Sequence, residues 1–239
     1  MNILITGGSS GLGRALVEKC AEQGEHILFT YNRNVGEAQN LCLKYANVEA
    51  RNVDFTSKES VKQFFEEIPD FNIDVLVNNA WVGNPNGTYF HKTNPNDFFT
   101  SFTNNVLPLI QITQACISEF RKQKNGKIIT ILTSYLLNLP PLGFSVYCAT
   151  KAYIEQLAKC WAKENIKFGI TSNCVSPEYM YTSFAKVDER VIEQMEQVHP
   201  LKHLLQPDEV ANVIYDIMNA SQQLNGVNIP INAGQNILK

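Results

Sequence analysis

A tyrosine and a lysine stand four residues apart in the stretch Tyr147-Cys148-Ala149-Thr150-Lys151. On a helix, residues at positions i and i+4 lie on one face, so the phenol and the ammonium are expected side by side. The ordinary pKa of a phenol is about 10, and a neighbouring ammonium favours the ionised form, so we expect Lys151 to lower the pKa of Tyr147. Such a pair can exchange a proton with a substrate oxygen at neutral pH. A solvent-exposed helical pair without a catalytic task would show the same spacing.

A glycine-rich stretch near the start of the chain, Thr6-Gly7-Gly8-Ser9-Ser10-Gly11-Leu12-Gly13, joins a β-rich run to a helical pattern. At such a junction the unpaired N–H groups of the helix N-terminus attract a phosphate, and glycines let the backbone approach it. The spacing of glycines at 7, 11 and 13 differs from the common GxGxxG fingerprint of dinucleotide-binding folds. The stretch therefore predicts a phosphate site, with a turn that binds nothing as the alternative.

The end of the second β-rich run indicates which dinucleotide is expected. An acidic residue there would bond the ribose 2′-hydroxyl of NAD, but the run ends in Thr30-Tyr31-Asn32-Arg33. An arginine can pair with a 2′-phosphate through forked, charge-assisted hydrogen bonds. Arg33 thus favours NADP(H) over NAD(H), unless it is an ordinary solvated loop arginine.

The elements that must carry these residues alternate along the chain. Helical patterns separate seven β-rich runs, at residues 3–6, 26–31, 48–53, 73–78, 127–133, 170–175 and 227–231. This alternation predicts an α/β fold, a single-domain Rossmann-type doubly wound parallel sheet of about seven strands with helices on both faces, over residues 1–239. The runs at 75–77 and 128–132 are apolar on both faces, as expected of central strands.

Helix boundaries follow from local patterns. Residues 11–23 carry apolar positions at helical spacing and predict the first crossover helix. Thr56-Ser57-Lys58-Glu59 fits a capping box, and Gln206-Pro207-Asp208-Glu209 fits a helix start running through Met218. The longest stretch without a clear period is residues 177–205.

Composition excludes several classes of protein. The net charge of −3 and scattered basic residues do not fit a nucleic-acid binder. No apolar run is long enough to span a bilayer and no leader sequence is evident, so we expect no membrane association and a cytoplasmic location. The six cysteines lack CxxC pairing and are expected to be reduced and buried, and the four histidines lack metal-ligand spacing, so no metal site is predicted.

Taken together, these motifs resemble the short-chain dehydrogenases/reductases. The glycine stretch, Asn78-Asn79-Ala80, Asn105, Ser134 and the Tyr147/Lys151 pair occur in the order and approximate spacing of that family. The resemblance extends to the C-terminal stretches 200–211 and 226–234, which look most like the 3-oxoacyl carrier-protein reductase branch.

The resemblance implies a role for each matching residue. Tyr147 would be the general acid in reduction, and Lys151 would lower its pKa and hold the nicotinamide ribose. Ser134 would polarise the carbonyl, and Asn105 would interrupt its helix and support a water-linked proton relay to Lys151. Asp54 would contact the adenine, Asn79 and Ala80 the adenosine side, and Thr182 the carboxamide. The implied NADP(H)-binding set is Gly7, Ser9, Ser10, Gly11, Leu12, Gly13, Asn32, Arg33, Asp54, Phe55, Asn79, Ala80, Tyr147, Lys151, Pro177 and Thr182.

Two positions depart from the family pattern. Trp81 stands where a glycine usually follows Asn78-Asn79-Ala80, and Glu178 stands where a glycine usually follows Pro177. Trp81 either narrows the pocket or packs as ordinary core. Glu178 either changes the chain path beside the nicotinamide or points to solvent.

Substrate specificity is expected in the loops beyond the carboxyl ends of the strands. Residues 136–144 and 179–184 are candidate walls, and 177–205 is long enough to form a lid. Their apolar and aromatic character favours a hydrophobic substrate, unless these side chains only pack against one another.

A basic cluster at residues 121–127 ends a predicted helix, where cations complement the helix dipole. By the resemblance, the same cluster could dock an acidic acyl carrier protein. Charge reversal at Lys122 and Lys124 would distinguish the helix-dipole interpretation from the docking of a carrier protein.

The sequence thus predicts NADPH-dependent reduction of a ketone, either a 3-oxoacyl thioester or another apolar oxo compound. The alternatives are NAD-dependent oxidation of a secondary alcohol or sugar, and a non-catalytic NADP-binding scaffold or sensor. A methyltransferase would have no task for Tyr147 and Lys151. By resemblance, the helices at 105–120 and 147–163 would form the interface of a homodimer or homotetramer.

Overall fold

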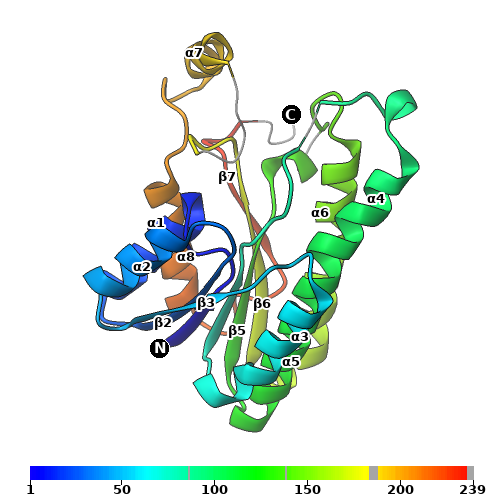
Figure 1. The fold of residues 1–239 in the computed structure, drawn as a ribbon. Helices are drawn as coiled ribbons and strands as arrows, with labels where there is room; N and C mark the ends of the chain where they lie inside the picture. Colours follow the sequence, from blue (N-terminus) through cyan, green and yellow to red (C-terminus); the bar gives the residue numbers. More distant parts are fainter. Residues whose placement is uncertain (86, 138, 183–187, 236–239) are drawn as a thin grey trace.

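A parallel sheet of seven strands runs through the computed structural model, which describes residues 1–85, 87–137, 139–182 and 188–235 (Figure 1). The spatial order of the strands is β3-β2-β1-β4-β5-β6-β7. The strands are β1 (Asn2–Ile5), β2 (His26–Tyr31), β3 (Val48–Asn52), β4 (Val75–Asn78), β5 (Gly126–Ile131), β6 (Ile170–Pro177) and β7 (Asn228–Ile231). The doubly wound sheet predicted from the sequence is confirmed, and every predicted strand lies within two residues of its observed ends.

Successive residues of the strands pack alternately into two hydrophobic cores, one on each face of the sheet. In β1, Ile3 and Ile5 pack into one core, whereas Leu4 packs on the opposite side with Leu76 and Ile128, and all five are fully buried. Side chains alternate between the two faces of a strand, so this division requires helices on both faces. Burial on both sides is the reason that the central runs are apolar on both faces.

Helices cover both faces as this burial demands (Figure 1). One face packs against α1 (Gly11–Glu22), α2 (Val35–Lys44) and α8 (Pro207–Asn219), and the other against α3 (Lys58–Glu67), α5 (Leu107–Gln123) and α6 (Ser145–Asn165). The short α4 (Pro95–Ser101) leads into α5 through a π-helical turn, Phe102–Val106. Helix α7 (Glu189–Val198) stands away from the sheet and buries none of its residues.

Local capping corrects one predicted helix start and supports another. The N-cap of α3 is Ser57, not Thr56, because the Ser57 hydroxyl accepts from the Ser60 N–H at 3.2 Å. The predicted start of α8 is present: the Glu209 carboxylate accepts from the Gln206 N–H at 2.8 Å. Helix α7 was not predicted, although its apolar residues Val191, Ile192, Met195 and Val198 recur at helical spacing.

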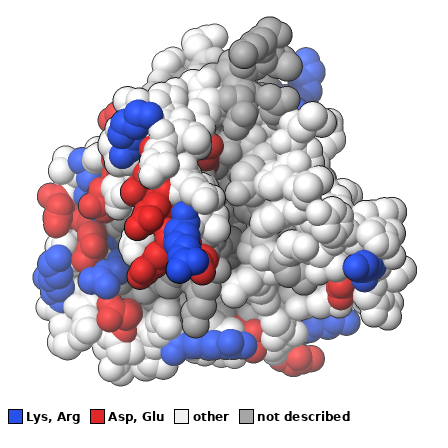
Figure 2. All heavy atoms as spheres, turned by 90° about the horizontal axis from the view of Figure 1, so that it is seen from above, with Lys and Arg blue, Asp and Glu red and all other residues white. Residues whose placement is uncertain are grey.

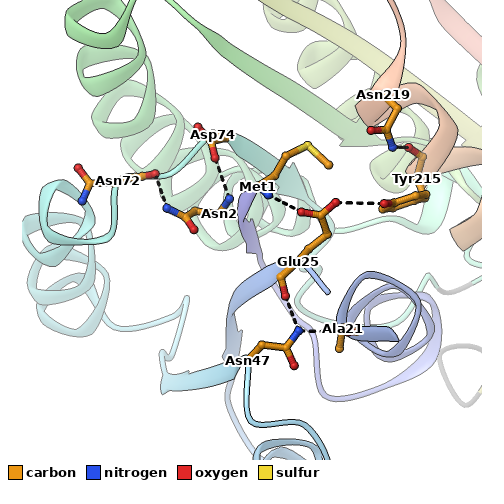
Figure 3. Close-up of polar contacts among 9 residues, drawn as sticks. All are labelled: Met1, Asn2, Ala21, Glu25, Asn47, Asn72, Asp74, Tyr215 and Asn219. Atoms are coloured by element: carbon orange, nitrogen blue, oxygen red, sulfur yellow. Dashed lines mark hydrogen bonds and ion pairs between the residues drawn. The ribbon is translucent and has the colours of Figure 1, made fainter. Parts of the chain in front are cut away.

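A polar network holds the amino ends of the strands, at the edge opposite the glycine turn (Figure 3). The carboxylate of Glu25, just before β2, accepts from the Tyr215 hydroxyl of α8 at 3.0 Å and pairs with the amino group of Met1. The Asp74 carboxylate, just before β4, accepts from the Asn2 N–H at 2.8 Å. These contacts tie β1, β2, β4 and α8 together far from the candidate site.

The cysteines are free thiols, and most are buried as expected. Burial raises the pKa of Cys20 to about 12, which keeps that thiol protonated. Cys160 is exposed, so the prediction of burial is wrong for this residue, which lies on the solvent side of α6. Within the described ranges no group of three or more potential metal ligands gathers, and no helix is long and apolar enough to cross a membrane.

Candidate active site

The glycine stretch forms the turn between β1 and α1. Gly7 and Gly11 have positive φ angles of 71° and 50°, a backbone region that side chains disfavour. A Cβ on Gly13 would lie 2.1 Å from the carbonyl oxygen of Gly7, so no larger residue fits at the first turn of the helix. The turn therefore requires glycine at these positions for its own shape, and it leaves the N-terminus of α1 uncovered by side chains of its own.

Two threonines and an asparagine brace this turn. The Thr6 hydroxyl accepts from the N–H groups of Asn79 and Ala80 at 2.9 and 3.0 Å, and the Thr30 hydroxyl accepts from the Gly7 N–H at 3.0 Å. The Asn79 side-chain amide donates to the carbonyl oxygens of Thr6 and Gly7 at 2.9 and 3.1 Å. Asn79 thus acts mainly as a brace. The bracing roles of Thr6, which directly follows β1, and of Thr30, near the end of β2, were not predicted.

The predicted cofactor residues around α1 differ in whether their side chains can contact a ligand. Ser9 is buried, Ser10 is the exposed N-cap, and the Leu12 side chain lies in the core, so Leu12 can contribute only its backbone. Thr182 lies over the turn, because its Cγ2 is 3.5 Å from the place of a Cβ on Gly11. The N–H groups of this helix end thus face a space bounded by Thr182.

The loop after β2 faces the loop after β3. The Asn32 amide donates to the Asp54 carboxylate at 3.3 Å, and the N–H and hydroxyl of Thr56 also donate to it. The hydrogen bonds from Thr56 lower the pKa of Asp54, and the nearby charge of Arg33 acts in the same direction. Arg33 is exposed, and within the described residues no carboxylate lies within salt-bridge distance of it. Phe55 does not face this loop, because its side chain is buried in the core with Val53, Val61 and Phe64.

Ser134, Tyr147 and Lys151 meet at the carboxyl end of β5. Ser134 begins the short 3-10 turn that follows the strand and is buried. The Lys151 Nζ donates to the Ile131 carbonyl at 2.7 Å, and the Tyr147 phenol shares a hydrogen bond with the Thr133 side chain. The strand end thus anchors both groups that α6 presents, next to Ser134.

Burial sets the protonation of this pair, and the predicted effect of Lys151 on Tyr147 is wrong for this structure. Burial raises the pKa of Tyr147 above its ordinary value, while the hydrogen bond with Thr133 acts in the opposite direction. Burial also lowers the pKa of Lys151 from 10.5 to about 7. The Lys151 Nζ lies over the Tyr147 ring, 5.9 Å from its centroid, and its bond goes to Ile131. The neutral phenol is therefore the favoured form at pH 7.

Asn105 interrupts its helix as the resemblance implied, within the π-helical turn. Its carboxamide binds both backbone groups of Val82: Oδ1 accepts from the Val82 N–H at 2.6 Å, and Nδ2 donates to the Val82 carbonyl at 3.2 Å. Nδ2 also donates to the Ser101 carbonyl. These contacts of Asn105 fix the loop after β4, and a relay to Lys151 stays a prediction.

Trp81, the first departure from the family pattern, lies directly on the catalytic candidates. Its ring meets that of Tyr147 edge to face, with centroids 5.0 Å apart, and the Lys151 Nζ lies 4.5 Å from its centroid. Trp81 also lines a cavity of about 230 Å³ together with Tyr147, Phe144 and Asn105. Both interpretations of Trp81 therefore hold in part, because it packs on core residues and forms a wall of the cavity.

Glu178, the second departure, is turned inward. Pro177 ends β6, and the Glu178 carboxyl lies 3.9 Å from the His199 Nε2, with one of its oxygens buried without a hydrogen bond among the described residues. Burial raises the pKa of Glu178. The alternative that Glu178 points to solvent is wrong.

The predicted substrate walls are partly described. Phe144 packs between Tyr135 and Tyr147, with ring centroids 5.6 and 6.4 Å away, so one wall closes against the candidate acid. Leu139 and Leu142 are strongly exposed, at 91% and 75%. Residue 138 and residues 183–187 of the predicted walls and lid lie outside the described residues.

Charge is unevenly spread around this end of the sheet. In Figure 2, lysine, arginine and acidic side chains gather over the half that carries α1 and α2, whereas the half that carries α4 and α6 is mostly uncharged. A phosphate-bearing ligand would thus suit the half with α1 and α2, and an apolar ligand the half with α4 and α6.

The predicted basic cluster at residues 121–127 is largely engaged within the chain. Lys122 pairs with Glu119 at 2.7 Å, and Lys127 of β5 donates to two carbonyls at the end of α8, both at 2.6 Å. Arg121 and Lys122 lie in the last turn of α5, as the dipole interpretation requires, whereas Lys127 complements the carbonyl end of a different helix, α8.

Comparisons with known proteins agree with this geometry. The family model described as "short chain dehydrogenase" matches residues 1–191. The chain is 30% identical over 240 residues to the 3-oxoacyl-[acyl-carrier-protein] reductase FabG of Aquifex aeolicus, covering 97% of this chain and 95% of that protein. It is 25% identical to an NADPH-dependent aldehyde reductase-like protein, chloroplastic, of Arabidopsis thaliana, covering 97% and 92%.

Solved structures share the fold over nearly the whole chain. "ElxO with NADP Bound" superposes with a TM-score of 0.86 at 25% identity and covers 98% of this chain and 97% of that one. A 3-ketoacyl-(acyl-carrier-protein) reductase from Brucella melitensis, complexed with NADH, superposes with a TM-score of 0.88 at 22% identity, covering 99% and 98%.

Proposed function

Because the chain belongs to the short-chain dehydrogenase/reductase family of oxidoreductases, which act on CH–OH and C=O groups, we propose that it reduces a ketone to a secondary alcohol with NADPH. The observation that carries this proposal is the anchoring of Tyr147 and Lys151 at the end of β5, beside Ser134.

The protonated form of Tyr147 suits a general acid in reduction. Bound NADPH would supply a hydride to the carbonyl carbon, and negative charge would develop on the carbonyl oxygen. The Ser134 hydroxyl donates a hydrogen bond to that oxygen, and Tyr147 gives it a proton. This proton donation needs the neutral phenol, the form that burial favours here.

The glycine turn fits a dinucleotide. The N-terminal end of α1 beside Gly7 and Gly11, where no side chain caps the helix, suits a pyrophosphate, and the exposed Arg33 suits a 2′-phosphate. The Arabidopsis relative is named as NADPH-dependent and the ElxO structure has NADP bound, and both support the preference for NADP(H).

We further propose an apolar oxo substrate, in the first place a 3-oxoacyl thioester. The exposed Leu139 and Leu142, on the loop that leads to Phe144 at the Tyr147 ring, support an apolar group, and the Aquifex relative is named for 3-oxoacyl substrates on acyl carrier protein. Docking of a carrier protein, a homodimeric or homotetrameric assembly and a cytoplasmic location stay predictions. Free, mainly buried thiols suit a reducing compartment.

The test is to follow NADPH and NADH oxidation at 340 nm with a panel of 3-oxoacyl thioesters, cyclic ketones and keto sugars. We expect turnover of at least one apolar ketone, with kcat/KM for NADPH at least about tenfold that for NADH, one good charge-assisted contact being about 1.4 kcal/mol. Turnover of secondary alcohols with NAD⁺, and of no ketone with NADPH, would contradict the proposal.

A further inference from the structure

The indole of Trp81 covers the two groups that the proposed chemistry needs. The Lys151 Nζ lies 4.5 Å from the Trp81 ring centroid, within the range of a cation–π contact, and the lysine is only 5% exposed. The Tyr147 ring meets the indole edge to face at 5.0 Å, the arrangement that aromatic pairs prefer. One side chain thus restrains both partners of the pair.

The backbone beside Trp81 is itself held in place. Both the N–H and the carbonyl of Val82 are bonded by the carboxamide of Asn105, at 2.6 and 3.2 Å. Because Asn105 is buried in the π-helical turn, this clamp fixes the chain one residue beyond the indole. The position of the ring therefore follows from the π-helical turn.

Trp81 also stands between the pair and the neighbouring cavity. The residues that line the cavity of about 230 Å³ include Trp81, Tyr147, Asn105, Asp97 and Asn104. Lys151 is not among its described lining residues, and it lies against the indole. The Trp81 ring thus separates the Lys151 ammonium from the cavity.

We infer that Trp81 is a positioning residue: its ring holds the Lys151 side chain and the Tyr147 ring in their mutual arrangement and separates Lys151 from the cavity. This inference rests on the proposed function for its effect on turnover. The ionisable groups described around Lys151 are the Tyr147 phenol on the same helix and the Cys174 thiol on β6, while Asp97 lines the cavity.

The first test needs no turnover. Trp161→Phe leaves Trp81 as the sole tryptophan of the chain, and its emission is titrated from pH 5.5 to 9. We expect a sigmoidal change with a midpoint near pH 7, where Lys151 titrates, and loss of that change when Lys151→Met is added. A curve that is the same with and without Lys151→Met would overturn the contact.

The second test compares rings with an aliphatic side chain. Trp81→Phe keeps a ring face, whereas Trp81→Leu keeps an apolar side chain without one. We expect Trp81→Phe to stay within about twofold of the wild-type kcat and Trp81→Leu to lose roughly tenfold, with KM for NADPH little changed in both. Equal kcat values for Leu and Phe would overturn the inference. A wild type without ketone reduction would instead contradict the proposed function, and the fluorescence titration would still decide whether Trp81 contacts Lys151.

Discussion

Lys151 should make the stability of the protein depend on pH in a defined window. The lysine is buried, and burial lowers its pKa from 10.5 to about 7, whereas the unfolded chain regains the ordinary value. Between these two values the unfolded chain binds a proton that the folded chain does not. The free energy of unfolding should therefore rise as the pH rises from about 7 to above 10, and the cost of burying the lysine is fully present below pH 7.

The size of this effect follows from the pKa difference. Each unit of pKa difference corresponds to about 1.4 kcal/mol, so the cost is about 5 kcal/mol at pH 6, about 3 kcal/mol at pH 8 and about 1 kcal/mol at pH 10. Lys151→Met removes this cost. It also removes the hydrogen bond to Ile131 and the packing against Trp81, which together offset about 2 kcal/mol of the gain. The part of the Trp81 contact that depends on the charge of the lysine is already contained in its pKa. The difference in stability between variant and wild type should thus fall by about 4 kcal/mol from pH 6 to pH 10.

The assay is urea-induced unfolding of the wild type and Lys151→Met at several pH values between 6 and 10, at one protein concentration. Lys163→Met is the matched control, because Lys163 is exposed on the same helix. We expect the control to follow the wild type at every pH. A difference between Lys151→Met and the wild type that stays constant from pH 6 to 10 would refute the assignment of a buried lysine with a lowered pKa.

Three further predictions concern other parts of the site. Gly13→Ala should abolish detectable NADPH binding in a calorimetric titration, since its Cβ would lie 2.1 Å from the Gly7 oxygen; retained affinity would contradict the tight turn. Arg33→Ala should weaken NADPH binding by roughly tenfold and leave NADH binding within about twofold, measured by nucleotide fluorescence; equal losses would rule out a 2′-phosphate contact. Glu178→Gln should raise the melting temperature at pH 8 by about 2–4 °C, because a buried carboxylate oxygen without a hydrogen bond carries a cost of about 1 kcal/mol; a lower melting temperature would mean that the carboxylate is well compensated.

The strands could be predicted because burial on both faces requires apolar residues at consecutive positions of the sequence. Strands such as β5 are covered on both faces and therefore are apolar throughout, from Ile128 to Ile131 except for a buried threonine. Helix α7 buries none of its residues, and it was missed although its apolar residues recur at helical spacing. The start of α3 was misplaced by one residue because Thr56 and Ser57 are both good caps, and only the geometry shows that Thr56 donates to Asp54.

The residues of the candidate site could be predicted from the sequence, but their protonation states could not. The spacing of Tyr147 and Lys151 places them together, yet the pKa of each depends on burial, which the local sequence does not contain. The contact of Trp81 with both is equally non-local, because it joins the loop after β4 to α6. The bracing hydroxyls of Thr6 and Thr30 were visible only as threonines at strand ends.

Tyr147 is proposed to protonate the product oxygen during NADPH-dependent ketone reduction, and the whole assignment of the site depends on this step. The most direct measurement is the initial rate of NADPH oxidation with the best ketone of the panel, for the wild type and for Tyr147→Phe, together with the Kd of each for NADPH. We predict that Tyr147→Phe lowers the rate by about 10² to 10⁴ while it binds NADPH with similar affinity, because only the proton donor is lost. A Tyr147→Phe variant that oxidises NADPH at close to the wild-type rate would contradict this role.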